Sequence, residues 1–272
     1  MVEHVIRPIN LSWVEMDLSL FTYKMNFGKP KKCVMSSYLI EGPDKYILID
    51  AGVSYDQLVG GYWPKNNEGT RQKQEGMEDI DRGFQMKAGP IAESFEAGLE
   101  KHGLSPSDID YVVMTHMMLD HIGNLYKCDK AKFVVQKEEI EFAMNPHPIQ
   151  GAYDHGLPHW PSVDKAIKDD RFDMLTGDSE LTKGVNILFT PGHSPGTQTV
   201  LIDTSKGKVA IPGMCSMKEN WNPPDWYPNP VIVCGIHGDA MQCYDSMLKV
   251  KEAADIIIPI HDPELSTQEK IG

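Results

Sequence analysis

Three apolar runs in this sequence each lead to a histidine, and no other feature constrains the fold as strongly. The runs and their histidines are 109–115 with His116, 185–190 with His193, and 256–260 with His261. Apolar runs of this length are typical of buried strands. Because functional side chains collect in the loops where the strands of a sheet end, we expect the three histidines to lie close together.

Two more side chains of a metal-binding type follow the first run. Asp120 and His121 come four and five residues after His116. Imidazole and carboxylate groups together suit zinc, iron or manganese. One such histidine alone is more often structural than a ligand, but five such residues at strand ends predict a metal site. The candidate ligands are His116, Asp120, His121, His193 and His261.

The rest of the sequence alternates between strand-like and helix-like segments. Besides the three runs above, the expected strands are residues 33–40, 46–49, 132–136, 197–203 and 208–212. The expected helices are residues 90–102, 137–144 and 239–253. The helical segments have apolar side chains at helical spacing, whereas the strand segments are short and apolar. This order predicts an α/β fold in which helices cover β-sheets.

Two long stretches between these elements are polar or irregular. Residues 54–89 are rich in glycine, asparagine, glutamine and charge, and loops of this length commonly serve function. Residues 146–160 contain three histidines, a tyrosine and a tryptophan, which suit either a pocket wall or a surface loop. The length of 272 residues with 41 % hydrophobic residues leads us to expect a single domain over residues 1–272.

Charge and apolar pattern limit the partners of the chain. The formal net charge is −13 without a basic stripe, which argues against nucleic acid. No stretch approaches the roughly 20 apolar residues that span a bilayer, and no signal-peptide pattern is visible. The five cysteines are scattered and predict no disulfide framework. We therefore expect a cytoplasmic protein with a small-molecule substrate and no membrane partner; a homodimer is compatible with these features.

The segments around the histidines resemble the metal-binding motifs of the metallo-β-lactamase superfamily. Residues 115–121 (THMMLDH) resemble its HxHxDH motif, residues 190–196 (TPGHSPG) its second histidine motif, and residues 258–263 (IPIHDP) its last. Residues 46–52 resemble its early strand, which ends in Asp-x-Gly. The resemblance is closest to the N-acyl homoserine lactonase and pyridoxolactonase group. It implies an αββα sandwich with the site at one edge of the paired sheets, and hydrolysis of a lactone.

The sequence departs from the family pattern at three positions. Met118 stands where the family has its second histidine, and Met214 stands where the family has a bridging aspartate. Met217 stands where the lactonases have a tyrosine near the substrate. The family roles therefore do not carry over to these positions. We expect the three methionines, with Trp221, to shape an apolar substrate pocket.

The resemblance also implies how the remaining ligands divide between two metal positions. One position would use His116, residue 118 and His193, and the other would use Asp120, His121 and His261. Only the second keeps all three ligands, so we predict one divalent metal, zinc in preference to iron or manganese. Asp120, His116 and His193 are then the candidate catalytic groups, as acids, bases or substrate-orienting residues.

Alternatives remain open for both the metal and the reaction. His116, Met118, His193 and Met214, with Cys215 nearby, would suit Cu(I), which prefers soft sulfur ligands. The predicted activity is hydrolysis of a lactone or a similar cyclic or aromatic ester by a metal-activated water. A lyase, isomerase or decarboxylase on the same fold is the alternative enzyme, and a binding protein without activity is the alternative to an enzyme.

Overall fold

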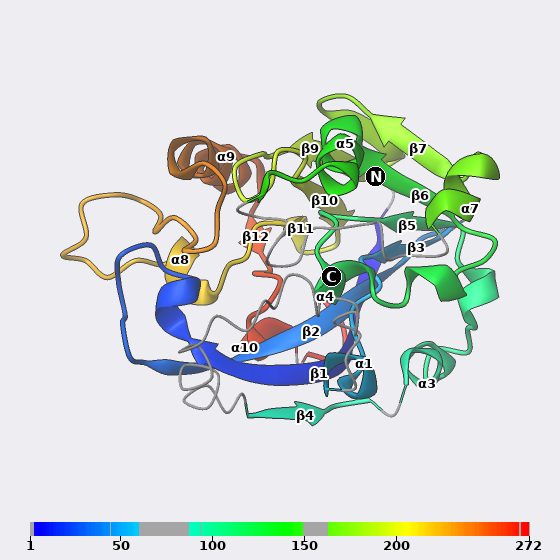
Figure 1. Ribbon diagram of the computed structural model, residues 1–272, viewed down its shortest axis with the longest axis horizontal. Coiled ribbons are helices and arrows are strands. Elements are labelled where there is room, and N and C mark those ends of the chain that lie inside the picture. The colour runs from blue at the N-terminus through cyan, green and yellow to red at the C-terminus, as the bar shows by residue number, and fades with distance from the viewer. Residues whose placement is uncertain are drawn as a thin grey trace.

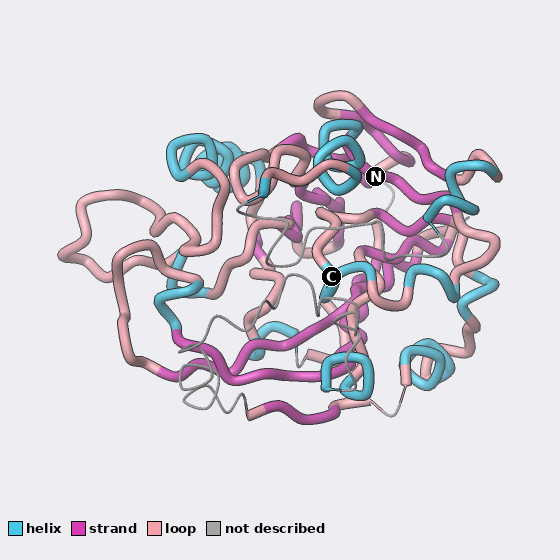
Figure 2. The backbone as a smooth tube through the Cα atoms, in the orientation of Figure 1, coloured by secondary structure: helices cyan, strands magenta, loops and turns pink. Residues whose placement is uncertain are grey.

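The computed structural model describes residues 3–43, 45–59, 87–92, 94–148, 163–266 and 268–271. Within these ranges the first β-sheet has the strand order β4-β1-β2-β3-β5-β6-β7, and the second has the order β12-β11-β10-β9-β8. Figure 1 shows α3, α7 and α9 towards the outside of the view, and Figure 2 shows the helices and strands of the same view in separate colours.

The bounds of the elements are as follows. The first sheet contains β1 (Val5–Asp17), β2 (Pro30–Glu41), β3 (Tyr46–Ile49), β4 (Ala88–Pro90), β5 (Tyr111–Val113), β6 (Lys132–Gln136) and β7 (Phe172–Leu175). The second contains β8 (Ser179–Thr182), β9 (Val185–Phe189), β10 (Gln198–Thr204), β11 (Gly207–Pro212) and β12 (Ile256–Ile257). The helices are α1 (Tyr55–Val59), α3 (Phe95–Glu100), α4 (Leu119–Ile122), α5 (Lys137–Met144), α7 (Val163–Lys168), α8 (Lys218–Trp221), α9 (Ala240–Ala253) and α10 (Pro263–Ser266).

Strand direction places the ends of several strands at one edge of the molecule. β3, β5, β6 and β7 run parallel to one another, whereas β1, β2 and β3 are joined in antiparallel pairs. In the second sheet β8 to β11 are antiparallel, and β12 joins β11 in parallel. Parallel strands end at the same edge of a sheet, so the loops after β3 and β5 lie side by side.

Alternating side chains divide the apolar core into layers. Ile40 of β2 and Val113 of β5 belong to the same buried cluster as Val200 and Ile202 of β10, so this cluster joins the two sheets. Leu201, the residue between them, instead belongs to the cluster that includes α9. This is the period of two that a strand imposes on its faces. The second sheet is therefore covered by the first on one face and by α9 on the other.

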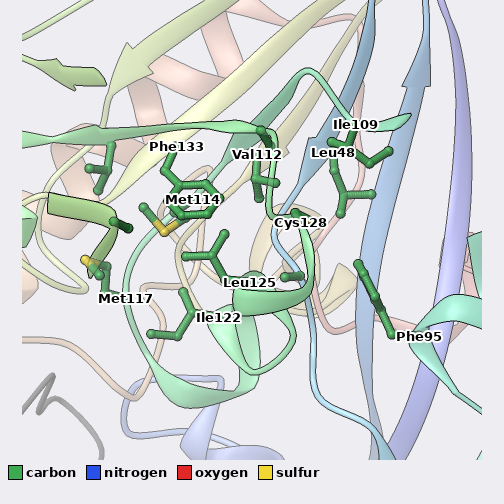
Figure 3. Packing of buried hydrophobic residues seen from close by; sticks show 14 of the residues in the cluster. Leu48, Phe95, Ile109, Val112, Met114, Met117, Ile122, Leu125, Cys128 and Phe133 are labelled. Atoms are coloured by element: carbon green, nitrogen blue, oxygen red, sulfur yellow. The ribbon is translucent and has the colours of Figure 1, made fainter. Parts of the chain in front are cut away.

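The outer face of the first sheet has its own apolar layer. Leu48 and Val112 point from the sheet into a buried cluster that also contains Phe95 of α3, Ile122 of α4 and Ile140 of α5. Figure 3 shows part of this cluster. Helices thus cover both outer faces of the two sheets. The predicted α/β fold, an αββα sandwich, is confirmed.

The structure corrects one predicted helix. Residues 90–102 were expected to begin a helix at Pro90, but Pro90 instead ends β4 and pairs with Ser12 of β1. The helix α3 begins only after Ser94, whose hydroxyl accepts a hydrogen bond from the Ala97 N–H. Serine is a preferred residue at this capping position because it satisfies an N–H that has no partner inside the helix.

Other predicted elements differ in length or were missed. β5 and β12 are shorter than the apolar runs 109–115 and 256–260, and the strand β1 was not predicted. The stretch expected as a loop, 54–89, contains α1 and β4 at its two ends, and its residues 60–86 lie outside the described residues. Most of the aromatic segment 146–160 also lies outside them. Among the described residues, no helix has the length and apolar content needed to cross a membrane.

A buried carboxylate on α5 ties two site loops together. Glu139 accepts hydrogen bonds from the Met117 N–H at 2.9 Å, the Ser194 hydroxyl at 2.6 Å and the Gly196 N–H at 3.0 Å. Gly196 lies so close that a Cβ there would come within 2.3 Å of the Glu139 nitrogen. The loop after β5 and the loop after β9 are therefore both held by this one side chain.

We predict that Glu139→Ala lowers the free energy of unfolding by about 2–3 kcal/mol, because it leaves buried donors without their acceptor. Chemical denaturation followed by circular dichroism measures the change. Glu141→Ala on the same helix is the control, since the Glu141 side chain is exposed and forms an i,i+4 ion pair with Lys137 at 3.5 Å. Its loss should stay within about 0.5 kcal/mol. Equal losses in the two variants would show that Glu139 does not hold the loops.

Candidate metal centre

Loops from both sheets bring the five predicted ligands together. His116 follows β5, Asp120 and His121 lie on α4, His193 follows β9, and His261 follows β12. The ring centroids of His116 and His121 are 3.9 Å apart, those of His116 and His193 are 4.6 Å apart, and those of His121 and His261 are 5.1 Å apart. Residues more than a hundred positions apart in the chain thus form one continuous cluster.

Asp120, His121 and His261 form the part of this cluster with metal-ligand geometry. Their candidate ligand atoms all lie within 4.8 Å of one another. Asp120 Oδ2 is 3.3 Å from His121 Nε2 and 3.7 Å from His261 Nε2. Both histidines are buried, whereas the Asp120 side chain is 24 % exposed. The three groups therefore face a common point, and Asp120 is the most exposed of them.

Asp50, directly after β3, orients two of the site residues from behind. Its Oδ2 accepts hydrogen bonds from His121 Nδ1 at 2.8 Å and from the Thr115 hydroxyl at 2.8 Å, and its Oδ1 accepts one from the Thr115 N–H at 2.7 Å. A carboxylate behind a histidine is the usual partner of a metal-binding imidazole. Sequence reasoning missed this role, although the Asp-x-Gly after an apolar strand was the signal that marked the residue.

The other three histidines are fixed in the same way, through Nδ1. His193 Nδ1 donates to the Ile236 carbonyl at 2.7 Å, and His261 Nδ1 donates to the Val34 carbonyl at 3.1 Å. His116 Nδ1 lies 3.2 Å from the Thr115 hydroxyl oxygen. That hydroxyl already donates to a carboxylate, so it accepts from the ring. The hydrogen-bond network thus assigns Nδ1 as the protonated nitrogen of each ring.

This arrangement fits a metal ion. Each imidazole presents Nε2 to the cluster while a protein acceptor holds Nδ1, which sets the tautomer that binds metal. The carboxylate of Asp120 adds the charge that a divalent ion requires. Two imidazoles and one carboxylate are the ligand set of many catalytic zinc sites.

The charges in the metal-free protein compensate one another. Burial disfavours a charged His121, but Asp120 and Asp50 on either side raise the pKa of His121 to about 10. Burial would raise the pKa of Asp120, yet the His121 ring outweighs it and lowers the pKa of this carboxyl below its ordinary range. Burial and then the charge on His121 lower the pKa of His261. A proton on His121 therefore occupies the place that a cation would take.

Met118 lies in the cluster at the position where the family has a histidine. Its Sδ is 3.2 Å from His193 Nε2, and that nitrogen is 3.2 Å from His116 Nε2. The structure therefore brings together all three residues of the first metal position that the resemblance implied, with a thioether in place of one imidazole.

An apolar pocket opens beside Asp120 and His261. Its walls come mainly from β1, β2 and the loop that carries Met118. The lining residues are Val14, Met16, Phe21, Cys33, Met35, Val53, Gln57, Met118, Leu119, Asp120, Cys215, Ile236 and His261. A concave, apolar surface with a few polar groups at one end is typical of small-molecule sites.

The structure places the other expected pocket residues differently from Met118. Met214 and Trp221 are buried in the apolar cluster beneath α9, and Met217 is buried among residues that form the back of the pocket wall. Among the described residues, these three are not part of the pocket lining. Cys215, in contrast, does line it, while Trp226 is 73 % exposed on the surface.

Two sequence relatives of the chain are both named as N-acyl homoserine lactonases. The chain is 35 % identical over 115 residues to the N-acyl homoserine lactonase AttM of Agrobacterium fabrum, which is 40 % of this chain and 41 % of that enzyme. It is 27 % identical over 202 residues to the N-acyl homoserine lactonase AiiA of Bacillus thuringiensis subsp. kurstaki, which is 72 % of this chain and 69 % of that enzyme. The match therefore spans about two fifths of AttM and a larger share of AiiA.

Solved structures share the fold over almost the whole chain. An N-acyl homoserine lactone hydrolase with the product N-hexanoyl-L-homoserine bound at its catalytic metal centre has a TM-score of 0.69 at 24 % identity, covering 97 % of this chain and 95 % of its own. The sequence profile of the metallo-beta-lactamase superfamily matches residues 31–259. Because this match covers most of the chain and includes every candidate ligand except His261, which lies two residues beyond its end, the chain belongs to the metallo-β-lactamase superfamily.

Proposed function

We propose that this chain is a metal-dependent hydrolase that opens a lactone or a similar cyclic ester. The observation that carries the proposal is the position of Asp120, His121 and His261, whose ligand atoms face one another beside an apolar pocket. The relatives named as N-acyl homoserine lactonases support it. The structural neighbour with N-hexanoyl-L-homoserine at its metal centre supports the same reaction class.

The cofactor of this proposal is a single divalent metal ion, with zinc preferred over iron or manganese. Asp120, His121 and His261 would hold it through one carboxylate and two imidazole groups. A dizinc lactonase, AidC, is among the structural neighbours, which favours zinc as the metal. When bound, such an ion lowers the pKa of a water molecule and polarises the carbonyl of an ester.

The side chains around this position bind and orient the substrate. Val14, Phe21 and Met35 offer apolar surface to an acyl or aromatic substituent and exclude water from the reacting end. Asp120 is the most exposed of the three ligands and lines the pocket, so its carboxylate can hold a proton released in the reaction. His116 lies against His121, and His193 lies against His116; both are candidates for orienting the substrate or for moving a proton.

The direct test is turnover of N-hexanoyl and N-decanoyl homoserine lactones by zinc-loaded protein, followed by mass spectrometry. We expect a product heavier than the substrate by one water. His261→Ala should lose this activity, and His102→Ala, outside the site, should keep it. A product of unchanged mass would favour an isomerase. No turnover on these or other cyclic esters, with zinc bound, would favour a binding protein.

We predict that Asp50→Asn weakens zinc binding about 10–100-fold, because the amide no longer accepts every hydrogen bond that fixes His121 and Thr115. Competition with a chromophoric chelator measures the affinity. Asp110→Asn is the matched control, since that half-buried carboxylate lies outside the site and accepts hydrogen bonds from Lys45 Nζ and the Tyr46 N–H. Equal affinities in the two variants would contradict the orienting role of Asp50.

We predict that zinc binding at pH ~6 releases about one proton per ion. The pKa of His121 is raised to about 10, so its ring keeps a proton in the metal-free protein at every pH below that value. Zinc replaces this proton, and its affinity therefore rises with pH up to about 10. At pH ~6 zinc-bound water, with a pKa near 7, contributes little. Calorimetry in buffers of different ionisation enthalpy counts the protons, and a count of zero would contradict the prediction.

A further inference from the structure

His116, Met118 and His193 form a second group of donor atoms beside the Asp120 cluster. His193 Nε2 is 3.2 Å from both His116 Nε2 and Met118 Sδ. The His116 ring also lies against the His121 ring, with centroids 3.9 Å apart. The proposed lactone hydrolysis gives no role to the sulfur of Met118, although this sulfur is in contact with the site.

The hydrogen-bond network decides whether each of these atoms presents a lone pair or a proton to its neighbours. His193 Nδ1 donates to a backbone carbonyl and His116 Nδ1 donates to the Thr115 hydroxyl, so in the neutral rings both Nε2 atoms carry lone pairs. The thioether of Met118 offers only lone pairs as well. His193 Nε2 thus lies 3.2 Å from a second imidazole nitrogen and 3.2 Å from a thioether sulfur, and a proton or a metal cation between these atoms would stabilise that spacing.

We propose that His116 Nε2, His193 Nε2 and Met118 Sδ bind a soft monovalent metal ion of the Cu(I) class, in a site distinct from the zinc site at Asp120. Thioether and imidazole ligands together select soft ions, whereas divalent zinc prefers imidazole, thiolate or carboxylate. The replacement of a histidine by Met118 thus changes the kind of ion that the position accepts.

Charge favours a monovalent ion at this place. Two adjacent divalent ions need carboxylates between them, because like charges at short range repel. Residue 214, where the family has a bridging aspartate, is a methionine that is buried in an apolar cluster. The carboxylate of Asp120 already belongs to the zinc position. A singly charged ion beside a divalent one therefore requires less compensation than a second divalent ion would.

The pocket gives an ion access to this second site. Met118 lines the pocket together with Asp120 and His261. Cys33 and Cys215 line it too, and thiols compete for soft ions. Burial raises the pKa of both cysteines well above the ordinary value, so they stay protonated near neutral pH. An experiment on the site must nevertheless separate the methionine from the cysteines.

The test uses Ag(I), a soft ion without redox chemistry, added to the zinc-loaded full chain. Protein labelled with 13C at the methionine methyl groups reports which sulfur binds. We expect the Met118 methyl signal to shift with the first equivalent, and Cu(I) under anaerobic conditions to give the same shift. Met118→Leu, which conserves volume, should weaken Ag(I) binding about a hundredfold. Met117→Leu, at the adjacent position but inside the apolar layer, should bind as the wild type does.

Met118→His provides the complementary change. It should lower the affinity for Ag(I) and raise the zinc content by one equivalent. The proposal is overturned if the Met118 methyl signal does not move, or if Cys215→Ser rather than Met118→Leu removes the binding. It is also overturned if the wild type binds a second zinc as tightly as Met118→His does. None of these measurements requires turnover, so they stand apart from the test of lactone hydrolysis.

Discussion

The structure depends above all on the buried carboxylate of Asp50. It accepts three hydrogen bonds, from the backbone and hydroxyl of Thr115 and from the ring of His121, and it does so without exposure to solvent. Its backbone adopts a left-handed conformation, with φ at 56°, which aspartate tolerates better than most residues. A buried charge is costly unless it is fully hydrogen-bonded. The loop after β3 therefore fixes the loop after β5, and through it the orientation of the candidate metal ligands.

Glu139 has a corresponding role between two other segments of the site. It joins the loop after β5, in the first sheet, to the loop after β9, in the second. The apolar core between the sheets sets their separation, but apolar packing is not directional. The two carboxylates fix how the loops are oriented, because hydrogen bonds require particular distances and angles. Rigid sheets with polar anchors at their ends thus hold five side chains at one edge.

The sequence was sufficient to predict those elements of the fold that depend on local patterns of apolar and polar residues. Most strands, the helix at 239–253 and the convergence of the histidines followed from apolar periodicity and from residue types at strand ends. The start of α3 depends on the cap at Ser94, and β1 depends on its pairing with β2, so local patterns predicted neither. Asp50 and Glu139 act through contacts with distant segments, which periodicity does not encode. For the same reason, only the structure separates Met118, which lines the pocket, from Met214, which does not.

The ligands of the site are far apart along the chain, and this has a consequence for how the protein is made. His116 and His121 come from the first sheet, His193 from the second, and His261 from the loop after the last strand. A set of contacts with such large sequence separation forms late in folding, because closing long loops costs entropy before any contact compensates. The complete ligand set therefore exists only once both sheets have docked. Neither sheet alone carries all the candidate ligands, so a chain whose sheets have not yet docked presents only part of the set.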